Sequence, residues 1–155
     1  MQVRISILLL AVLFSVPAFA QPYWLQKGGG VGNDEGMDVS TDASGNVFST
    51  GYFSVGATFG SVTPSNAGIT DAYLAKMLPT GAYLWVNSGG GAGSDRALST
   101  CTDAAGNSYM TGFYEGTAFF GSQNITSSGS QDMFVAKYDP AGNLLWVTHR
   151  RRPFG

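Results

Sequence analysis

Acidic residues recur along the chain at a fixed interval of 61 positions, a pattern that raises the question of carboxylate chemistry. The pairs are Asp34 and Asp95, Asp42 and Asp103, and Asp71 and Asp132. Paired carboxylates can act as general acid and base. A catalytic pair would normally break the symmetry of a repeat, whereas turn and strand-end acceptors follow it. We therefore predict structural hydrogen-bonding roles for these acids.

A glycine-rich motif precedes both acids of the first pair, Asp34 and Asp95. Residues 29–34 and 90–95 both fit G-G-x-G-x-D, which is typical of calcium-binding β-helix turns. Such turns share calcium between copies nine residues apart, whereas these copies lie 61 apart. No helix follows the glycines to offer its N-terminus to a phosphate. We expect a tight turn between repeats, with no metal and no cofactor.

Nucleophilic catalysis lacks its usual residues. His149 is the only histidine and Cys101 the only cysteine of the chain. A serine or cysteine nucleophile needs a nearby base, and a carboxylate-binding hydrolase needs several arginines. We predict that the chain is not an enzyme. Cys101 is expected to be a small packed residue, with an intermolecular disulfide as the alternative.

Aromatic residues also recur with the repeat and are the candidate binding residues. They are Trp24, Trp85, Trp146, Tyr52 and Phe113. At repeat-equivalent positions, aromatic side chains are favoured as packing between sheets. Stacking on a sugar ring at the surface is the alternative interpretation.

The 61-residue interval is an internal repeat. Residues 24–84 align with 85–145 without a gap, and 24 of the 61 positions are identical. Each unit reads as two hairpins: strands flank a D-x-x-G-N turn, then flank a Pro-x-Gly turn, with a Gly- and Ser-rich loop between the hairpins. A four-stranded unit repeated at a fixed period is typical of β-propeller blades. The predicted fold is all-β, with two four-stranded antiparallel blades of an incomplete propeller.

The segments TDASGNVFSTGYF, ATFG and DAYLAKMLPTGAYLW carry a family likeness. Together with the W-x₃-GGG-x-G-x-D pattern, they resemble the bacterial β-propeller repeat often labelled SBBP. The likeness extends over residues 24–146. It implies a propeller module within a larger secreted or surface protein, and it implies no catalytic residues.

Residues 1–20 have the pattern of a secretory signal peptide. Arg4 precedes an apolar run, and Ala18-Phe19-Ala20 fits a cleavage site. We expect cleavage after Ala20, a secreted or cell-surface location, and no membrane span in the mature chain. The formal net charge of −2 argues against nucleic acid as a partner.

The predicted organisation is a signal peptide (1–20), repeat 1 (21–84), repeat 2 (85–146) and an aberrant tail (147–155). Arg150, Arg151 and Arg152 stand where the repeat predicts three glycines. Glycine codons read in a shifted frame can encode arginine, so we interpret the tail as the start of a third repeat read out of frame. A true basic tail and a truncated gene fragment are the alternatives.

The sequence therefore predicts a non-catalytic structural or protein-interaction module, with other blades or copies of itself as partners. Two open blades leave strand edges exposed, so we expect the chain to assemble with its copies or to fold poorly. The alternative is a two-blade carbohydrate-binding subunit that oligomerises into a closed propeller.

Overall fold

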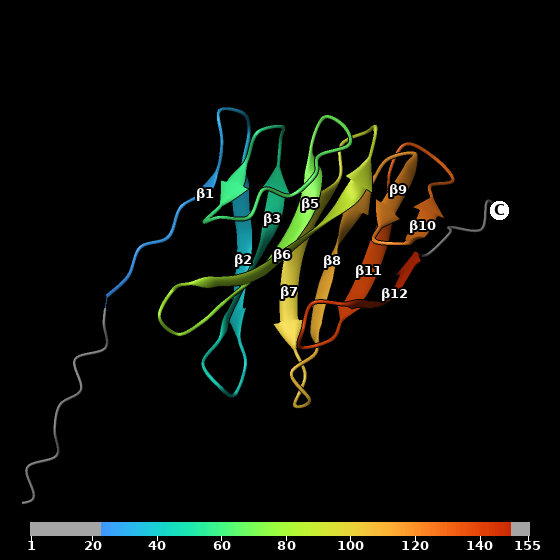
Figure 1. Ribbon diagram of the computed structural model, residues 1–155. Helices are drawn as coiled ribbons and strands as arrows, with labels where there is room; N and C mark the ends of the chain where they lie inside the picture. Colours follow the sequence, from blue (N-terminus) through green and yellow to red (C-terminus); the bar gives the residue numbers. More distant parts are fainter. Residues whose placement is uncertain (1–22, 150–155) are drawn as a thin grey trace, which may run out of the picture.

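The structure, a computed structural model that describes residues 23–149, consists of β-strands and turns, with no helix in that range. Two four-stranded antiparallel blades lie side by side (Figure 1); the first is part of a six-stranded sheet, which β9 and β10 extend beyond β6, and the second is a sheet of its own. In blade 1 the strands, in order, are β2 (Glu35–Thr41), β3 (Val47–Phe53), β5 (Asp71–Met77) and β6 (Tyr83–Gly91). Blade 2 contains β7 (Arg96–Thr102), β8 (Ser108–Tyr114), β11 (Asp132–Tyr138) and β12 (Leu144–His149). The all-β prediction with incomplete antiparallel blades is confirmed.

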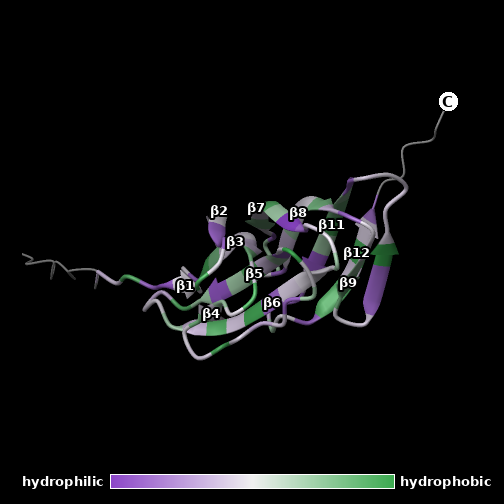
Figure 2. Cartoon of the chain, turned by 90° about the horizontal axis from the view of Figure 1, so that it is seen from above, coloured by the Kyte–Doolittle hydropathy of each residue, from purple (hydrophilic) through white to green (hydrophobic). Residues whose placement is uncertain are grey.

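The two blades meet mainly at β7, the first strand of blade 2. Seen from above, β2, β3, β5 and β6 follow one another across the molecule, with β7, β8, β11 and β12 beside them (Figure 2). The inner strand β7 packs against β2 and β3. A bulge falls after Gly36 in β2 and after Ala97, its repeat equivalent, in β7. The inner strands of the two blades, β2 and β7, therefore pair in the same register and have a bulge at the same position.

The segment between the second and third strands of each blade is more ordered than the predicted loop. We call these segments insert 1 (54–70) and insert 2 (115–131). Insert 1 contains β4 (Thr58–Phe59), which pairs with β1 (Gly28–Gly29). Insert 2 contains a hairpin, β9 (Thr117–Phe120) and β10 (Gln123–Thr126), and β9 pairs with the last three residues of β6. Each insert thus reaches back to the end of the preceding outer strand.

The turns hold their shape through one backbone pattern and a supporting carboxylate. Asp42 N–H donates to Asn46 O at 3.1 Å, and Gly45 N–H donates to Asp42 O at 3.0 Å. The Asp42 side chain accepts further bonds from the backbone N–H groups of Ser44 and Asn46. Gly45 has φ of 76°, a conformation that side chains with a Cβ disfavour. Asp103 and Asp139 support equivalent turns.

The main hydrophobic core lies at the junction of the two blades. Phe48 and Leu74 of blade 1 belong to one buried cluster with Met110, Tyr114 and Phe134 of blade 2. A smaller cluster, centred on Phe53, Phe59 and Tyr73, lies beneath insert 1. Burial of apolar side chains between the two blades therefore stabilises their packing.

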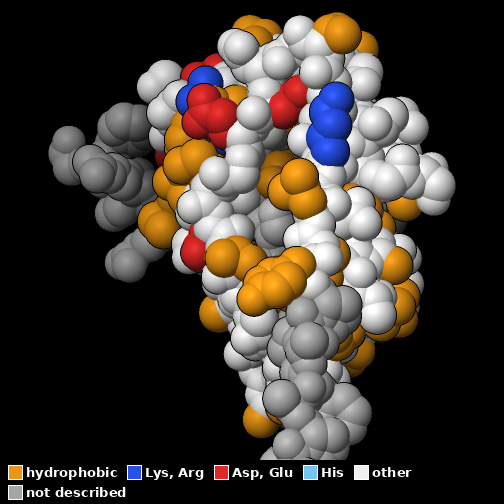
Figure 3. Space-filling view, turned by 90° about the vertical axis from the view of Figure 1, so that its left-hand side faces the viewer, with side chains coloured by type: hydrophobic (Ala, Val, Ile, Leu, Met, Phe, Trp, Pro, Cys, Tyr) orange, Lys and Arg blue, Asp and Glu red, His pale blue; other side chains and the backbone are white. Residues whose placement is uncertain are grey.

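The outer flank of blade 1 is less completely covered. On this flank hydrophobic side chains reach the surface between polar ones (Figure 3). In the segment that leads into blade 1, Tyr23, Leu25 and Val31 are almost fully exposed. Packing between two complete repeats is therefore seen at the junction between blades 1 and 2, and not at this flank.

Candidate functional site at the junction between the blades

A tryptophan from one outer strand reaches the turn between the third and fourth strands of the next blade. Trp85 Nε1–H of β6 donates to Pro140 O of blade 2 at 3.3 Å. Trp24 Nε1–H, one repeat earlier, donates to Pro79 O of blade 1 at 2.8 Å. The same donor and acceptor positions are used in both cases. This bond is a repeated element of the architecture.

The glycine of each turn lies directly beneath the tryptophan ring. Gly142 has φ of 91°, and a Cβ there would come within 2.8 Å of the Trp85 ring. Gly81 has φ of 88° and is equally close to Trp24. Both the backbone conformation and the contact therefore require glycine.

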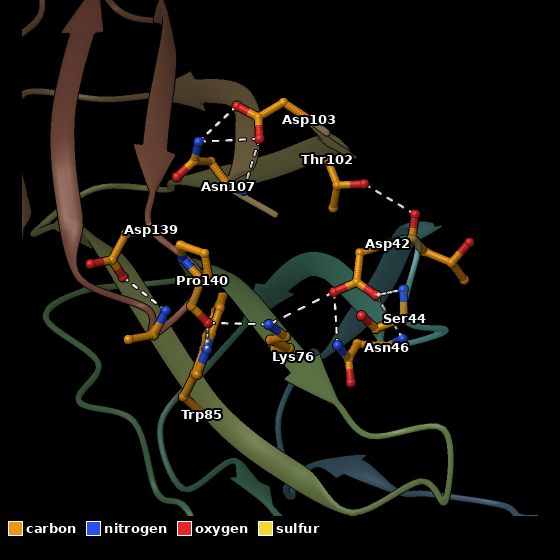
Figure 4. A network of polar contacts seen from close by, with 12 residues as sticks. Asp42, Ser44, Asn46, Lys76, Trp85, Thr102, Asp103, Asn107, Asp139 and Pro140 are labelled. Atoms are coloured by element: carbon orange, nitrogen blue, oxygen red, sulfur yellow. Dashed lines mark hydrogen bonds and ion pairs between the residues drawn. The ribbon is translucent and has the colours of Figure 1, made fainter. Parts of the chain in front are cut away.

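Two further side chains of blade 1 bind the same turn. Lys76 Nζ donates to Pro140 O at 3.1 Å, and Asn87 Nδ2–H donates to Gly142 O at 2.7 Å. Figure 4 shows Lys76 and Trp85 converging on the Pro140 carbonyl. Three donors of blade 1 thus hold one turn of blade 2.

Lys76 is a buried cation with three interactions. Only 6% of the residue is exposed, its Nζ lies 3.8 Å from Asp42 Oδ2, and it stands 5.2 Å from the centre of the Phe48 ring. Burial acts to raise the pKa of Asp42, but the bonds from Asn46 and Ser44 and the charge of Lys76 together hold it below its usual value. The ionised pair is consistent with a structural role, because a buried charge needs such partners.

Blade 2 repeats this ion pair in a more exposed setting. Lys137 Nζ lies 3.4 Å from Asp103 Oδ2 and 4.9 Å from the centre of the Tyr109 ring. The Asn107 side chain, with the Asn107 backbone, Tyr109 and Lys137, lowers the pKa of Asp103 to about 2 against opposing desolvation. Lys137 is thus the blade 2 equivalent of Lys76, the lysine of blade 1 that binds the Pro140 turn of blade 2.

The inner strands are joined by side chains that stand one repeat apart. Asp38 Oδ2 accepts bonds from Ser99 Oγ at 2.6 Å and from Thr100 N–H at 2.9 Å. Thr102 Oγ1–H donates to Thr41 O at 3.0 Å. These bonds fix the relative height of β2 and β7.

The aspartates of the two G-G-x-G-x-D motifs accept hydrogen bonds that link neighbouring sheets. Asp95 accepts Gly91 N–H at 2.7 Å and Glu115 N–H at 3.0 Å, linking the end of β6 to the end of β8. Asp34 makes the equivalent bonds to Gly30 and Ser54. The carboxylate oxygens serve backbone N–H groups, as expected for structural acceptors.

The structure does not bring the five predicted binding residues together into one site. Trp24 and Trp85 lie at successive junctions, and Trp146 packs edge to face against Tyr109, with ring centres 6.2 Å apart. Tyr52 and Phe113 both lie near Arg96, whose guanidinium is 4.2 Å from the centre of the Tyr52 ring and 6.0 Å from that of Phe113. Their role in ligand binding stays a prediction.

The prediction that Cys101 is a packed residue is wrong. Its side chain is exposed on β7, because the alternation of the strand buries Thr100 instead. Within residues 23–149 no group of three or more His, Cys, Asp or Glu side chains is placed to hold a metal ion. His149 Nδ1 lies 2.7 Å from Tyr114 Oη and ends β12. Residues 147–149, assigned by the sequence to the tail, thus continue a regular strand, whereas 1–22 and 150–155 lie outside the described residues.

Sequence reasoning missed the junction residues Lys76, Asn87 and Asp38. The conservation of Lys76 as Lys137 within the repeat was a usable signal. Asp38 gave none, because the second repeat has Ser99 at that position and the two residues are each other's partners.

No family model matches the chain. The chain is 30% identical, over an alignment of 145 residues, to an uncharacterized WD repeat-containing protein of Acanthamoeba polyphaga mimivirus. The match covers 81% of this chain and 10% of that protein, so the chain spans about a tenth of its relative's length. Each tryptophan here is followed by an aliphatic residue rather than by the Asp of a WD dipeptide. The likeness and the all-strand blades together assign the chain to a propeller-like repeat architecture.

Proposed function

We propose that the chain is an exported propeller module that serves as a non-catalytic scaffold for protein interaction. The observation that carries this proposal is the repeated junction. Two of the three donors that hold the Pro140 turn recur in blade 2, Lys76 as Lys137 and Trp85 as Trp146, whereas Asn87 is replaced by Thr148. Blade 2 therefore offers a further blade the lysine and the tryptophan by which it is itself held.

The partner that fits this surface is another blade of the same kind, in a copy of the chain or in a longer protein. Leu145, Trp146 and Met133 of blade 2 are about half exposed. Trp146 makes no hydrogen bond to a Pro-x-Gly turn within residues 23–149, the only part described. We propose on this basis an SBBP-like module of a larger extracellular or surface protein. Residues 23–149 contain no helix long and apolar enough to span a membrane.

Sedimentation velocity of the mature chain over a range of concentrations tests the assembly. We expect reversible association that weakens in W146A, because this variant removes the ring that would reach the neighbouring turn. W24A is the matched control, since Trp24 already serves the Pro79 turn. A folded chain that stays monomeric at all concentrations would contradict a copy of the chain as the partner.

Export is tested separately by expressing the full chain in a secreting host. Mass spectrometry of the released product should give a protein that begins at Gln21. A product that keeps residues 1–20 inside the cell would contradict the proposed location.

A further inference from the structure

The segment that leads into blade 1, residues 24–29, occupies on blade 1 the place that residues 85–90 of β6 occupy on blade 2. The two stretches are repeat equivalents. Gly28 pairs with Phe59, and the same register recurs one repeat later between β6 and β9. Blade 1 therefore carries, from its own chain, a substitute for the outer strand of a neighbouring blade.

This leading segment has less support than β6. Pairing with β5 holds β6 along its length, whereas residues 24–27 belong to no strand. Leu25 is 95% exposed. Trp24 therefore holds this end of the segment, through its bond to Pro79 O and the contact of its ring with Gly81. A segment with so few contacts opens at a low cost in free energy.

The Pro79 turn also has fewer donors than the equivalent turn of blade 2. Pro140 O accepts from both Lys76 and Trp85. Among residues 23–149, Trp24 is the only side-chain donor to Pro79 O. Because a carbonyl oxygen has two lone pairs, Pro79 O can accept a second hydrogen bond. A blade with both a lysine and a tryptophan would use this acceptor more fully than Trp24 does.

Blade 2 has both of these residues on the side that no other blade covers. Lys137 and Trp146 are the repeat equivalents of Lys76 and Trp85. Trp146 is 39% exposed. Lys137 is paired with Asp103, but the equivalent Lys76 binds a turn while it is paired with an aspartate in the same way. Blade 2 of one copy can therefore approach the Pro79 turn of another only if Trp24 moves away.

The exchange is confined to the tryptophan end of the leading segment. Arg150 stands at the repeat position of Gly28, where a Cβ would come within 2.6 Å of the Phe59 ring. A second copy therefore cannot replace the glycines. Gly28 and Gly29 keep their pairing with β4, and residues 24–27 leave the turn.

We propose that the Pro79 turn of blade 1 is the docking site for Trp146 of a second copy, and that Trp24 of the same chain occupies this site until the copy displaces it. This inference rests on the proposed association between copies and adds the surface on which it occurs. Trp24 thereby limits self-association, because only the fraction of chains with an open turn can bind.

Sedimentation velocity of the mature wild type, W24A, W146A and W24A/W146A tests this competition. We expect W24A to associate about fivefold more tightly than the wild type, since the variant removes a competing hydrogen bond. W24A/W146A should associate no more tightly than W146A. The matched control is L25A, which changes an exposed neighbouring side chain and should leave association unchanged.

Unfolding curves show whether W24A remains folded, and W24F, which keeps the ring but loses the bond, should give a smaller gain. Hydrogen exchange of the indole N–H groups, followed by NMR, is a readout on the wild type itself. On association, exchange should become faster at Trp24 and slower at Trp146. If the wild type associates but W24A is no tighter, or Trp24 stays protected, this inference is overturned and the association between copies stands. If neither chain associates, both are wrong.

Discussion

The carboxylate of Asp38 accepts a hydrogen bond of 2.6 Å from Ser99, the residue that occupies its own position one repeat later. Two copies of one position thus face each other across the junction, one as the acceptor and one as the donor. The bond explains why the repeat is not identical here, because two carboxylates would repel each other. The difference between the copies is part of the contact.

Replacing Asp38 by Ala should lower the free energy of unfolding by about 1 kcal/mol, since two hydrogen bonds to a charged group are lost from a partly exposed site. S99A should cost less, because the Thr100 N–H bond to Asp38 remains. Urea unfolding followed by tryptophan fluorescence measures both. A double-mutant cycle with no coupling free energy between Asp38 and Ser99 would show that this bond does not stabilise the junction.

W85F should destabilise the chain by about 1 kcal/mol, because the bond from the indole N–H to Pro140 O is lost. W146F is the matched control at the equivalent position. It should have a smaller effect, since Trp146 makes no such bond within residues 23–149. Thermal unfolding of the two variants gives the comparison, and equal losses would argue against the tryptophan-turn contact as a source of stability.

Gly142 and Gly116 separate backbone strain from a steric clash. Both have positive φ, 91° and 69°, but only Gly142 lies beneath a ring; a Cβ at Gly116 meets nothing within 4 Å. G116A should be destabilised by about 1 kcal/mol from strain alone. G142A should lose more, because the Trp85 ring must also move. Chemical denaturation tests the order, which would be reversed or absent if the ring did not pack on this turn.

Asp71 makes a specific prediction for the pH dependence of stability. Desolvation, opposed by the bond from Ala67 N–H and aided by the charge of Asp95, raises the pKa of Asp71 to about 6, above the usual value of an aspartate. The folded chain therefore binds this proton more tightly than the unfolded chain, and the carboxyl destabilises the fold as pH rises from about 4 through 6. D71N should gain stability over the wild type at neutral pH and lose that advantage near pH 4.

The control for this titration is D132N, for which no such pH-dependent gain is expected. Urea unfolding at a series of pH values measures the difference between each variant and the wild type. A constant difference for D71N across the series would mean that the carboxyl is not desolvated as the structure places it.

The parts of the fold that follow local patterns were predictable. The D-x-x-G-N turns carry their own hydrogen bonds, so the hairpins at Asp42 and Asp103 could be located from the sequence. The pairing of Gly28–Gly29 with Thr58–Phe59 could not, because strands of two residues have no readable periodicity.

The burial of Asp71 was beyond sequence reasoning for a different reason. Asp71 and Asp132 are identical in the repeat, yet Asp71 is buried and Asp132 is partly exposed. What separates them is their surroundings, which no single-sequence pattern encodes. The same holds for Cys101, whose exposure depends on which face of β7 meets blade 1.

Extending the chain by one repeat tests the central claim most directly. In this variant residues 85–149 are repeated after Leu145, so that a second copy of Trp85 stands at the position of Trp146. The copied Pro140 turn then becomes available to that tryptophan. We predict a higher free energy of unfolding than for the two-blade chain, and a further loss of about 1 kcal/mol when the new tryptophan is changed to Phe. An extended chain that is no more stable than the original, or indifferent to that substitution, would contradict a propeller-like array built from repeated junctions.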